Sequence, residues 1–252
     1  MNPNRTNSSP DAPEHLAGGA PAAGGQFILE RRARLVRSLF PSERGHLVDF
    51  GCGNGAQTLL FADDFDRLTG VDISENFLED FRREIVTQHL HGRVEAVATG
   101  GGPIPLPDGA ADVVTSFTVL EHVPDEQAAL AEMRRILRPG GKLIISVPNR
   151  WWIFETHGAD LPLLPWNRVP LVSWWPKRLH DRWARARIYR RREIENILVQ
   201  SGFSIDVSFR MTAPMDMVRW EPLRRLVRST MFRPDRAVTP IQATEIVVAA
   251  TR

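Results

Sequence analysis

Short apolar segments alternate with amphipathic segments between residues 47 and 147, and this alternation leaves few folds open to the chain. The apolar segments, each of a length that suits one strand, are residues 47–50, 68–73, 94–98, 111–119 and 142–147. Helices are expected between them at 56–65, 74–90 and 125–137. In the second helix Ser74 can cap the N-terminus, and one face carries Phe77, Leu78, Phe81 and Ile85. Strands that alternate with helices form a parallel sheet covered on both faces, so the sequence predicts an α/β, doubly wound fold.

The segments outside this region complete one domain. A helix is expected over 27–40, and a helix, a strand, an arginine-rich helix and a last strand follow over 191–200, 203–209, 216–231 and 245–250. Residues 1–26 are rich in Pro, Gly, Ser and Ala and lack a spaced apolar pattern, so we expect a disordered tail there. The domain then spans 27–252 and carries an insert at 150–189.

Composition excludes several classes of protein. The chain has one cysteine, which excludes an intramolecular disulfide framework and a cysteine-rich zinc site. No apolar run approaches the roughly 18 residues that suggest a spanning helix. The polar N-terminus lacks the basic and apolar pattern of a secretory signal. We therefore expect a cytoplasmic protein, and we expect any membrane contact to be peripheral and on the inner face.

A glycine-rich loop follows the first strand, in the sequence Asp49-Phe50-Gly51-Cys52-Gly53-Asn54-Gly55. Glycines there let the backbone turn tightly and let a ligand approach without Cβ clashes. By itself the loop is weak evidence, because a tight strand-to-helix turn would also explain it. Asp72, near the end of the second strand, strengthens the case. A carboxylate at this place in doubly wound sheets accepts hydrogen bonds from ribose hydroxyls, so the pair predicts a nucleoside-containing ligand.

The spacing of the glycines bears on which nucleoside is bound. The dinucleotide fingerprint is G-x-G-x-x-G, whereas this loop reads G-x-G-x-G and places Ala56 where the fingerprint has its third glycine. Asp49 would repel a pyrophosphate but would attract an ammonium group. These features point to S-adenosylmethionine, which has an adenosine, an ammonium group and no phosphate.

Five motifs, in order along the chain, resemble those of class I S-adenosylmethionine-dependent methyltransferases. They are LVDFGCGNG at 47–55, GVDIS at 70–74, LPDGAADVV at 106–114, VLEHV at 119–123 and ILRPGGKL at 136–143. The chain looks especially similar to the branch that contains ubiquinone and menaquinone biosynthesis methyltransferases and small-molecule O-methyltransferases. The resemblance implies a Rossmann-like, seven-stranded mixed sheet with an antiparallel last strand.

The resemblance also implies roles for residues at the matching positions. The methionine part of the cofactor would be held by Asp49, Gly51, Cys52, Gly53, Asn54 and Gly55. Asp72 would bind the ribose, Ile73 would lie against the adenine, and Ser116 and Phe117 would line the methyl-donor side. The family usually has an Asp shortly after the third strand, but residues 98–102 contain no acid. Thr99 and backbone groups are the substitutes available for holding the adenine.

Methyl transfer to an oxygen or a nitrogen can also need a general base. His122, after the fourth strand, is a candidate, although it would equally serve to cap the next helix or to bond the loop. Glu155 and His157, after the fifth strand, are further candidates, with anchoring of the insert as the alternative. His180 and Tyr189 are weaker candidates. No spacing of His, Cys, Asp and Glu suggests a metal site.

The insert differs in composition from the rest of the chain. It contains six of the seven tryptophans, from Trp151 to Trp183. Residues 150–192 carry ten basic and three acidic side chains, a local charge of +7. Three interpretations stay open: a cap with its own small core, which would close over the acceptor; a peripheral membrane contact; and, least favoured by the motifs, a nucleic-acid contact.

The sequence therefore predicts methyl transfer from S-adenosylmethionine to a hydrophobic or lipid-linked small molecule, at an oxygen in preference to nitrogen or carbon. Three alternatives remain. They are a methyltransferase of a polar or macromolecular acceptor, a nicotinamide-dependent oxidoreductase, and a catalytically silent protein that docks on a membrane or on a partner.

Overall fold

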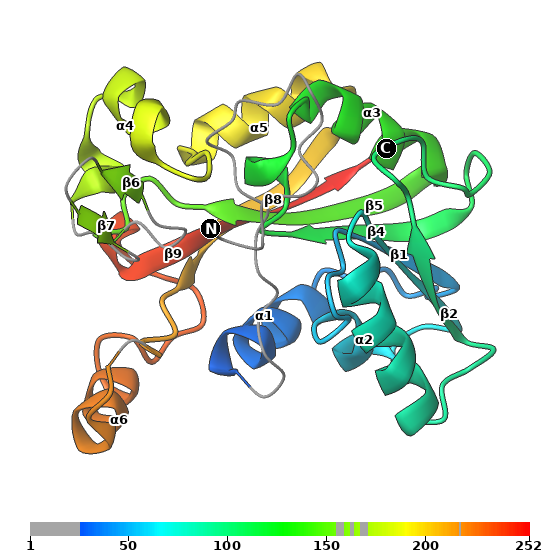
Figure 1. The fold of residues 1–252 in the computed structure, drawn as a ribbon, viewed down its shortest axis with the longest axis horizontal. Helices are drawn as coiled ribbons and strands as arrows, with labels where there is room; N and C mark the ends of the chain where they lie inside the picture. Colours follow the sequence, from blue (N-terminus) through cyan, green and yellow to red (C-terminus); the bar gives the residue numbers. More distant parts are fainter. Residues whose placement is uncertain (1–25, 155–158, 162–163, 167–170, 217) are drawn as a thin grey trace.

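A seven-stranded sheet in the order β3-β2-β1-β4-β5-β9-β8 forms the centre of the computed structural model (Figure 1). The structure describes residues 26–154, 159–161, 164–166, 171–216 and 218–252. The strands are β1 (His46–Phe50), β2 (Arg67–Asp72), β3 (Val94–Ala98), β4 (Ala111–Phe117), β5 (Leu137–Pro148), β8 (Ser204–Thr212) and β9 (Ala243–Thr251). β1 to β5 pair in parallel, and β9 is antiparallel to both β5 and β8. The predicted seven-stranded mixed sheet is confirmed.

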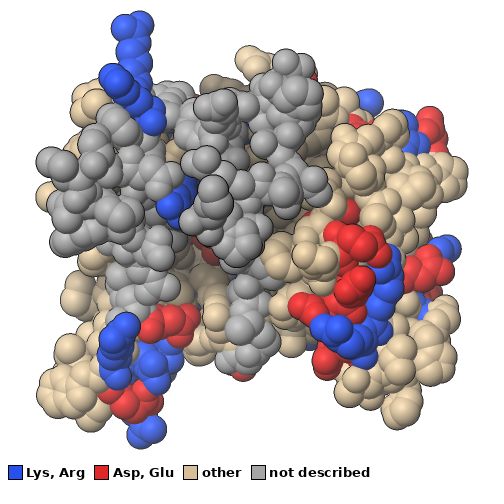
Figure 2. Space-filling view, viewed as in Figure 1, with Lys and Arg blue, Asp and Glu red and all other residues tan. Residues whose placement is uncertain are grey.

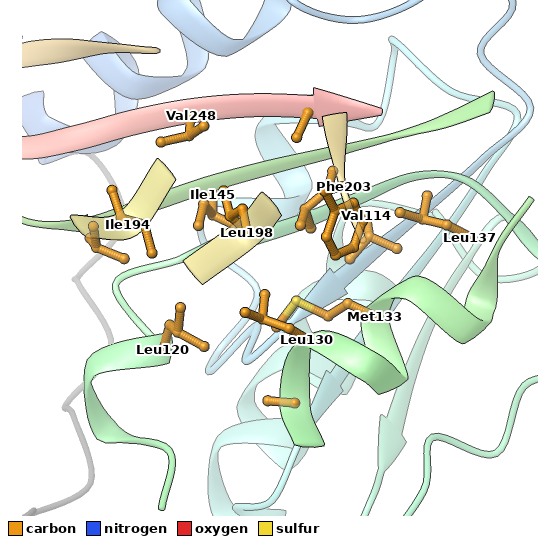
Figure 3. Close-up of a cluster of buried hydrophobic side chains, with 14 of the residues drawn as sticks. Val114, Leu120, Leu130, Met133, Leu137, Ile145, Ile194, Leu198, Phe203 and Val248 are labelled. Carbon is orange, nitrogen blue, oxygen red and sulfur yellow. The ribbon is translucent and has the colours of Figure 1, made fainter. Parts of the chain in front are cut away.

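Helices cover both faces of the sheet (Figure 1). α1 (Phe27–Arg37) and α2 (Glu75–Thr87) lie on one face, and α3 (Glu126–Ile136) and α5 (Arg191–Gln200) lie on the other. Successive strand residues point to opposite faces, so Val113 packs with the α1 and α2 side chains whereas Val114 packs with those of α3 and α5. Figure 3 shows the second layer, in which Leu130 and Met133 of α3 lie below the sheet residues.

The helix starts follow the sequence with one difference. In α3, the Asp125 carboxylate accepts hydrogen bonds from the backbone N–H groups of Gln127 and Ala128, each at 3.0 Å. α2 buries Leu78, Phe81 and Ile85, as predicted. Ser74 occupies the N-cap position of α2, but its side chain does not cap the helix. The Ser74 N–H instead donates to the Asp72 carboxylate at 2.9 Å, so the residue that ends β2 also organises the start of α2.

Two predicted segments differ in the structure. The predicted helix at 56–65 is only a single 3-10 turn, η1 (Thr58–Phe61). Asp63, Asp64 and Asp66 follow it, and negative charge at the carbonyl end of a helix is unfavourable. Likewise, β5 begins at Leu137, earlier than the predicted residue 142, and it includes Gly140, which has a φ of +76°.

The two long excursions from the sheet contain little regular structure. Between β5 and α5, the described residues form β6 (Ala159–Leu161), β7 (Leu164–Trp166), η3 (Val172–Trp174) and α4 (Lys177–Trp183). Between β8 and β9 lies α6 (Glu221–Ser229), which projects away from the sheet (Figure 1). α6 is shorter than the predicted 216–231 because Pro222 fixes the start of the helix. None of the helices in the described ranges is long and apolar enough to cross a membrane.

The topology brings these excursions to one edge of the sheet. β8 runs in the same direction as β5 because both are antiparallel to β9. The segments that follow β1, β4, β5 and β8 therefore all leave from the carboxyl edge of the parallel strands. The glycine loop, the insert and the α6 segment, which we define as residues 213–242, share this edge. Ligands bind at this edge in doubly wound folds.

Candidate cofactor and active site

The glycine loop lies against the end of β2. The backbone N–H groups of Gly51 and Cys52 both donate to the carbonyl oxygen of Val71, at 2.8 and 3.1 Å. Gly55 has a φ of +75°, and a Cβ built there would lie 2.0 Å from the Phe81 ring of α2. A side chain at this position would therefore clash with the helix and strain the backbone. The glycines allow α2 and the loop to pack directly against each other.

Asp72 connects the loop to the second strand. One carboxylate oxygen accepts from the N–H of Gly53 at 2.8 Å, and the other accepts from the N–H of Ser74 at 2.9 Å. A carboxylate offers about four acceptor positions, so two remain for hydroxyl groups of a ligand. Ile73, next in the chain, leaves 55% of its surface exposed. The Thr99 N–H donates to the Asp72 carbonyl at 3.1 Å, so the three residues predicted to contact the nucleoside lie together.

Asp49 lies deeper than Asp72, with 2% of its surface exposed. Its two carboxylate oxygens accept hydrogen bonds from the hydroxyls of Thr58, at 2.5 Å, and Thr115, at 2.8 Å. Burial raises the pKa of Asp49, and the nearby charge of Asp72 adds to this effect. The two threonine hydrogen bonds and the charge of Arg32 oppose the rise in pKa. A cation beside the carboxylate would also favour the ionised form.

The hydrogen bonds from Thr58 and Thr115 to Asp49 were not predicted from the sequence. Thr115 interrupts an apolar strand and pairs in register with Asp49, so a polar residue in β4 was an available signal. Thr58 had no comparable signal, because its position depends on the short 3-10 turn that replaces the expected helix.

The remaining loop residues shape the backbone. The Cys52 thiol is buried, and burial raises its pKa well above the usual value, so the thiol stays protonated. A buried and protonated thiol is a poor nucleophile. The Asn54 side chain accepts from the N–H of Ala56 at 3.3 Å and so closes a turn.

Ser116 and Phe117 end β4 on opposite faces of the sheet. Phe117 packs in the α1 and α2 layer, where the Arg32 guanidinium lies 5.3 Å from its ring centroid. Ser116 follows Val114 by two positions and so points to the α3 and α5 face. The Ser116 hydroxyl is buried and has no hydrogen-bond partner among the described residues. The two residues predicted to line the methyl-donor side therefore lie in different layers.

His122 ends the turn η2 (Leu120–His122) at the carboxyl edge and is half-buried. The chain after α4 packs against this turn. The Arg187 N–H donates to the carbonyl of Glu121 at 3.2 Å, and the Arg187 guanidinium donates to the carbonyl of Pro124 at 3.0 Å. The Tyr189 hydroxyl donates to Glu126, and burial raises the pKa of Tyr189 far above its usual value. Tyr189 thus anchors the insert as a neutral donor. Glu155 and His157 lie outside the described residues.

The described tryptophans of the insert do not form a single group. Trp152 is buried, and its ring centroid lies 6.5 Å from that of Phe232 in the α6 segment. Trp151 and Trp174 are exposed and linked by a hydrogen bond of 3.2 Å from the Trp174 indole to the Trp151 carbonyl. One tryptophan of the insert therefore packs against the α6 segment, and two others lie on the surface. In the ranges the structure describes, no three His, Cys, Asp or Glu side chains are grouped as metal ligands.

Comparison with known proteins agrees with this geometry. Residues 48–145 match the family model described as a methyltransferase domain. A probable S-adenosylmethionine-dependent methyltransferase of Mycolicibacterium smegmatis is 36% identical over 121 residues, which cover 48% of this chain and 44% of that protein. A demethylmenaquinone methyltransferase of Listeria monocytogenes is 35% identical over 101 residues, 39% of this chain and 42% of that protein. The chain spans less than half the length of these curated relatives.

Solved structures share the fold. An S-adenosylmethionine-dependent methyltransferase from Mesorhizobium loti superposes with a TM-score of 0.59 at 19% identity, covering 89% of this chain and 100% of that one. A geranyl diphosphate C-methyltransferase from Streptomyces coelicolor superposes with a TM-score of 0.60 at 16% identity, covering 88% and 77%.

Proposed function

We propose that this chain, which carries a class I S-adenosylmethionine-dependent methyltransferase domain, transfers the methyl group of S-adenosylmethionine to an oxygen atom of a hydrophobic or lipid-linked small molecule. The S–CH₃ bond breaks, an O–CH₃ bond forms, and the acceptor oxygen gives up its proton. One observation carries the proposal: Asp49, Asp72 and the glycine loop meet at the carboxyl ends of β1 and β2.

The donors and acceptors at this edge fit the cofactor. Asp72 has two acceptor positions open to the ribose hydroxyls, and the exposed Ile73 offers an apolar surface to the adenine. Asp49 favours an ammonium group over a phosphate because its charge and that of Asp72 act on the same space. When bound, the cofactor supplies an electrophilic methyl group on a sulfonium.

Holding the acceptor in line with the S–CH₃ bond supplies much of the catalysis of such a displacement. An oxygen acceptor also needs a path for its proton. His122 is the described candidate for the base because it lies at the carboxyl edge beside the insert. Glu155 and His157, which follow β5 in the chain, are also proposed as bases. Tyr189 is unsuited to this role, since its raised pKa keeps it protonated.

The class of acceptor is argued from the insert and from the relatives. The insert offers the exposed indoles of Trp151 and Trp174 at the edge where the acceptor enters. Aromatic side chains suit rings and hydrocarbon chains. Several relatives, among them the demethylmenaquinone methyltransferase and the geranyl diphosphate C-methyltransferase, have names that also point to acceptors with apolar parts.

Binding of S-adenosylhomocysteine tests the cofactor assignment. Asp72→Ala should weaken binding about 10- to 100-fold, because it removes hydrogen bonds to a charged acceptor. An analogue without ribose hydroxyls should bind wild type and variant with similar affinity. Asp125→Ala is the matched control, since it also removes a carboxylate that accepts two backbone N–H groups. Equal losses for both ligands would mean that Asp72 only shapes the loop.

Transfer of labelled methyl groups tests the acceptor. The protein is incubated with methyl-labelled S-adenosylmethionine and with soluble and membrane fractions of the source cell, and the label is partitioned between organic and aqueous phases. Asp72-dependent label in the organic phase supports the apolar acceptor. Label only in the aqueous phase would favour a polar or macromolecular acceptor. Cofactor binding without transfer from any fraction would favour the silent binding protein.

A further inference from the structure

The α6 segment exposes an unusual amount of apolar surface. Thirteen large apolar residues of the described chain are exposed, and six of them fall between residues 220 and 241. They are Trp220 (67% exposed), Leu223 (40%), Leu226 (59%), Met231 (66%), Val238 (82%) and Ile241 (56%). Single exposed apolar residues are ordinary, whereas a cluster of this kind marks an interaction surface.

Helix α6 separates this apolar surface from a basic one. None of its residues is buried. Leu223, Leu226 and Val227 recur at helical spacing on one side, with Trp220 one turn before them. The opposite side carries Arg224 and Arg225, and also Arg228, whose guanidinium pairs with Asp216 and lies 4.3 Å from the ring centroid of Phe27. This pattern is typical of helices that lie in the plane of a membrane interface.

The segment around α6 is also positively charged. The α6 segment, residues 213–242, contains six arginines and three acidic residues, a net charge of +3. Glu221 pairs with both Arg224 and Arg225, but 79% of the Arg225 side chain stays exposed. Within the part of the chain that the structure describes, Arg219 and Arg233 have no acidic partner. Figure 2 shows basic and acidic side chains together at the lower left, where Figure 1 places α6. Uncharged side chains, drawn in tan, lie next to them.

The base of the segment is fixed, so its exposure does not arise from a loose attachment. The guanidinium of Arg31, which is 1% exposed, donates to the carbonyls of Thr212, Ala213 and Phe232 at 2.8–3.1 Å. At the other end, the Asn149 amide donates to the carbonyls of Pro240 and Ala243, each at 2.8 Å. Bonds at both ends hold α6 out from the sheet.

We propose that α6 and its flanking residues dock on the surface of an anionic lipid membrane. Trp220, Leu223 and Leu226 would enter the boundary between headgroups and acyl chains, and the arginines would contact lipid phosphates. A second copy of this chain fits less well, because the same net positive charge would face itself. Residues 1–25 offer only Met1 and Leu16 as large apolar side chains, too few to cover six.

The position of the surface deepens the proposed function and rests on it. The α6 segment and the insert leave the same edge as the glycine loop, and Trp152 and Phe232 bring the two excursions into contact. A membrane bound to α6 would therefore lie next to the entrance for the acceptor. An acceptor dissolved in lipid would reach the cofactor without crossing water.

Vesicle flotation tests the docking. Wild-type protein is mixed with vesicles of phosphatidylcholine alone or with about a third phosphatidylglycerol, without cofactor or acceptor. We expect binding to the anionic vesicles that weakens at high salt, because screening removes the electrostatic part. Leu226→Glu and Arg225→Glu should each lower the bound fraction about tenfold or more.

The matched controls lie on α2. Val86 is 62% exposed next to Arg82 and Arg83, and the Arg83 side chain is 73% exposed with an acidic neighbour, as Arg225 is. Val86→Glu and Arg83→Glu should bind vesicles like the wild type, and all four variants should keep the wild-type melting temperature.

Three results would overturn the proposal. They are no binding of the wild type to anionic vesicles, equal loss in the α2 controls, and sedimentation that shows a dimer broken by Leu226→Glu. Since the assay needs neither cofactor nor acceptor, its failure is distinguishable from a failure of methyl transfer.

Discussion

The glycine loop and the α6 segment leave the same edge of the sheet, but they differ in burial. The loop is packed and hydrogen-bonded, whereas the α6 segment exposes its side chains. In the loop, the polar groups of Asp49 and Asp72 are engaged by neighbours, and the space beside Gly55 is filled by Phe81. In α6 no residue is buried, and apolar side chains face outward. A loop that recognises a small ligand needs fixed geometry, whereas a helix that meets a surface needs exposed area and charge.

The largest expected effect tests how closely the loop is packed. Gly55→Ala should lower the free energy of unfolding by about 4 kcal/mol, because it adds both backbone strain and overpacking against Phe81. Gly140 has nearly the same φ, +76°, but nothing lies within 4 Å of a Cβ built there. Gly140→Ala should therefore cost only about 1 kcal/mol, the strain alone. Urea unfolding measures both free energies. Equal losses would show that the Phe81 side chain moves away from the added methyl group at little cost.

A second effect tests whether buried hydrogen bonds hold the base of the α6 segment as firmly as packing holds the loop. Arg31→Met should lower the free energy of unfolding by about 3 kcal/mol, since it leaves three carbonyls without their donor. Arg34→Met removes a more exposed partner of the same Asp235, so it should cost less than about 1 kcal/mol. Limited proteolysis should also cut residues 213–242 faster in Arg31→Met. If both variants cost the same, Arg31 does not anchor the segment.

The smallest effect sharpens the role proposed for Asp49. Its raised pKa means that Asp49 takes up a proton at a higher pH than an exposed carboxyl. An ammonium group prefers the ionised form, so S-adenosylhomocysteine should bind more weakly as the pH falls through this pKa. The affinity should fall up to about tenfold per pH unit, the slope for one linked proton. Calorimetry from pH 8 to pH 5 checks this.

Asp49→Asn supplies the comparison for that titration. Its amide oxygen can accept from one threonine and its NH₂ group can donate to the hydroxyl of the other, but the side chain cannot ionise, so the dependence on pH should flatten. If the wild-type affinity changes with pH no more than that of Asp49→Asn, down to the pH at which the protein unfolds, Asp49 does not act on the ammonium group.

Local patterns were enough to predict most of the sheet. The apolar segments that became β1, β2, β4 and β5 are buried on both faces, and such strands are recognisable as short continuous apolar runs. Failures came where tertiary context outweighed local preference. Residues 56–65 form only a 3-10 turn, and β5 begins at Leu137 instead of the predicted residue 142. A contact distant in sequence extends β5, since the Gly140 N–H donates to the Arg252 carbonyl.

The glycine loop and the position of Asp72 at the end of β2 could be predicted from local sequence, because each depends on neighbours in the chain. The partners of Asp49 depend on the packing of distant segments, since Thr58 and Thr115 reach it from separate elements. Packing also leaves the apolar side of α6 uncovered. An amphipathic pattern states that a helix has two sides, but whether the apolar side is covered depends on what else folds against it.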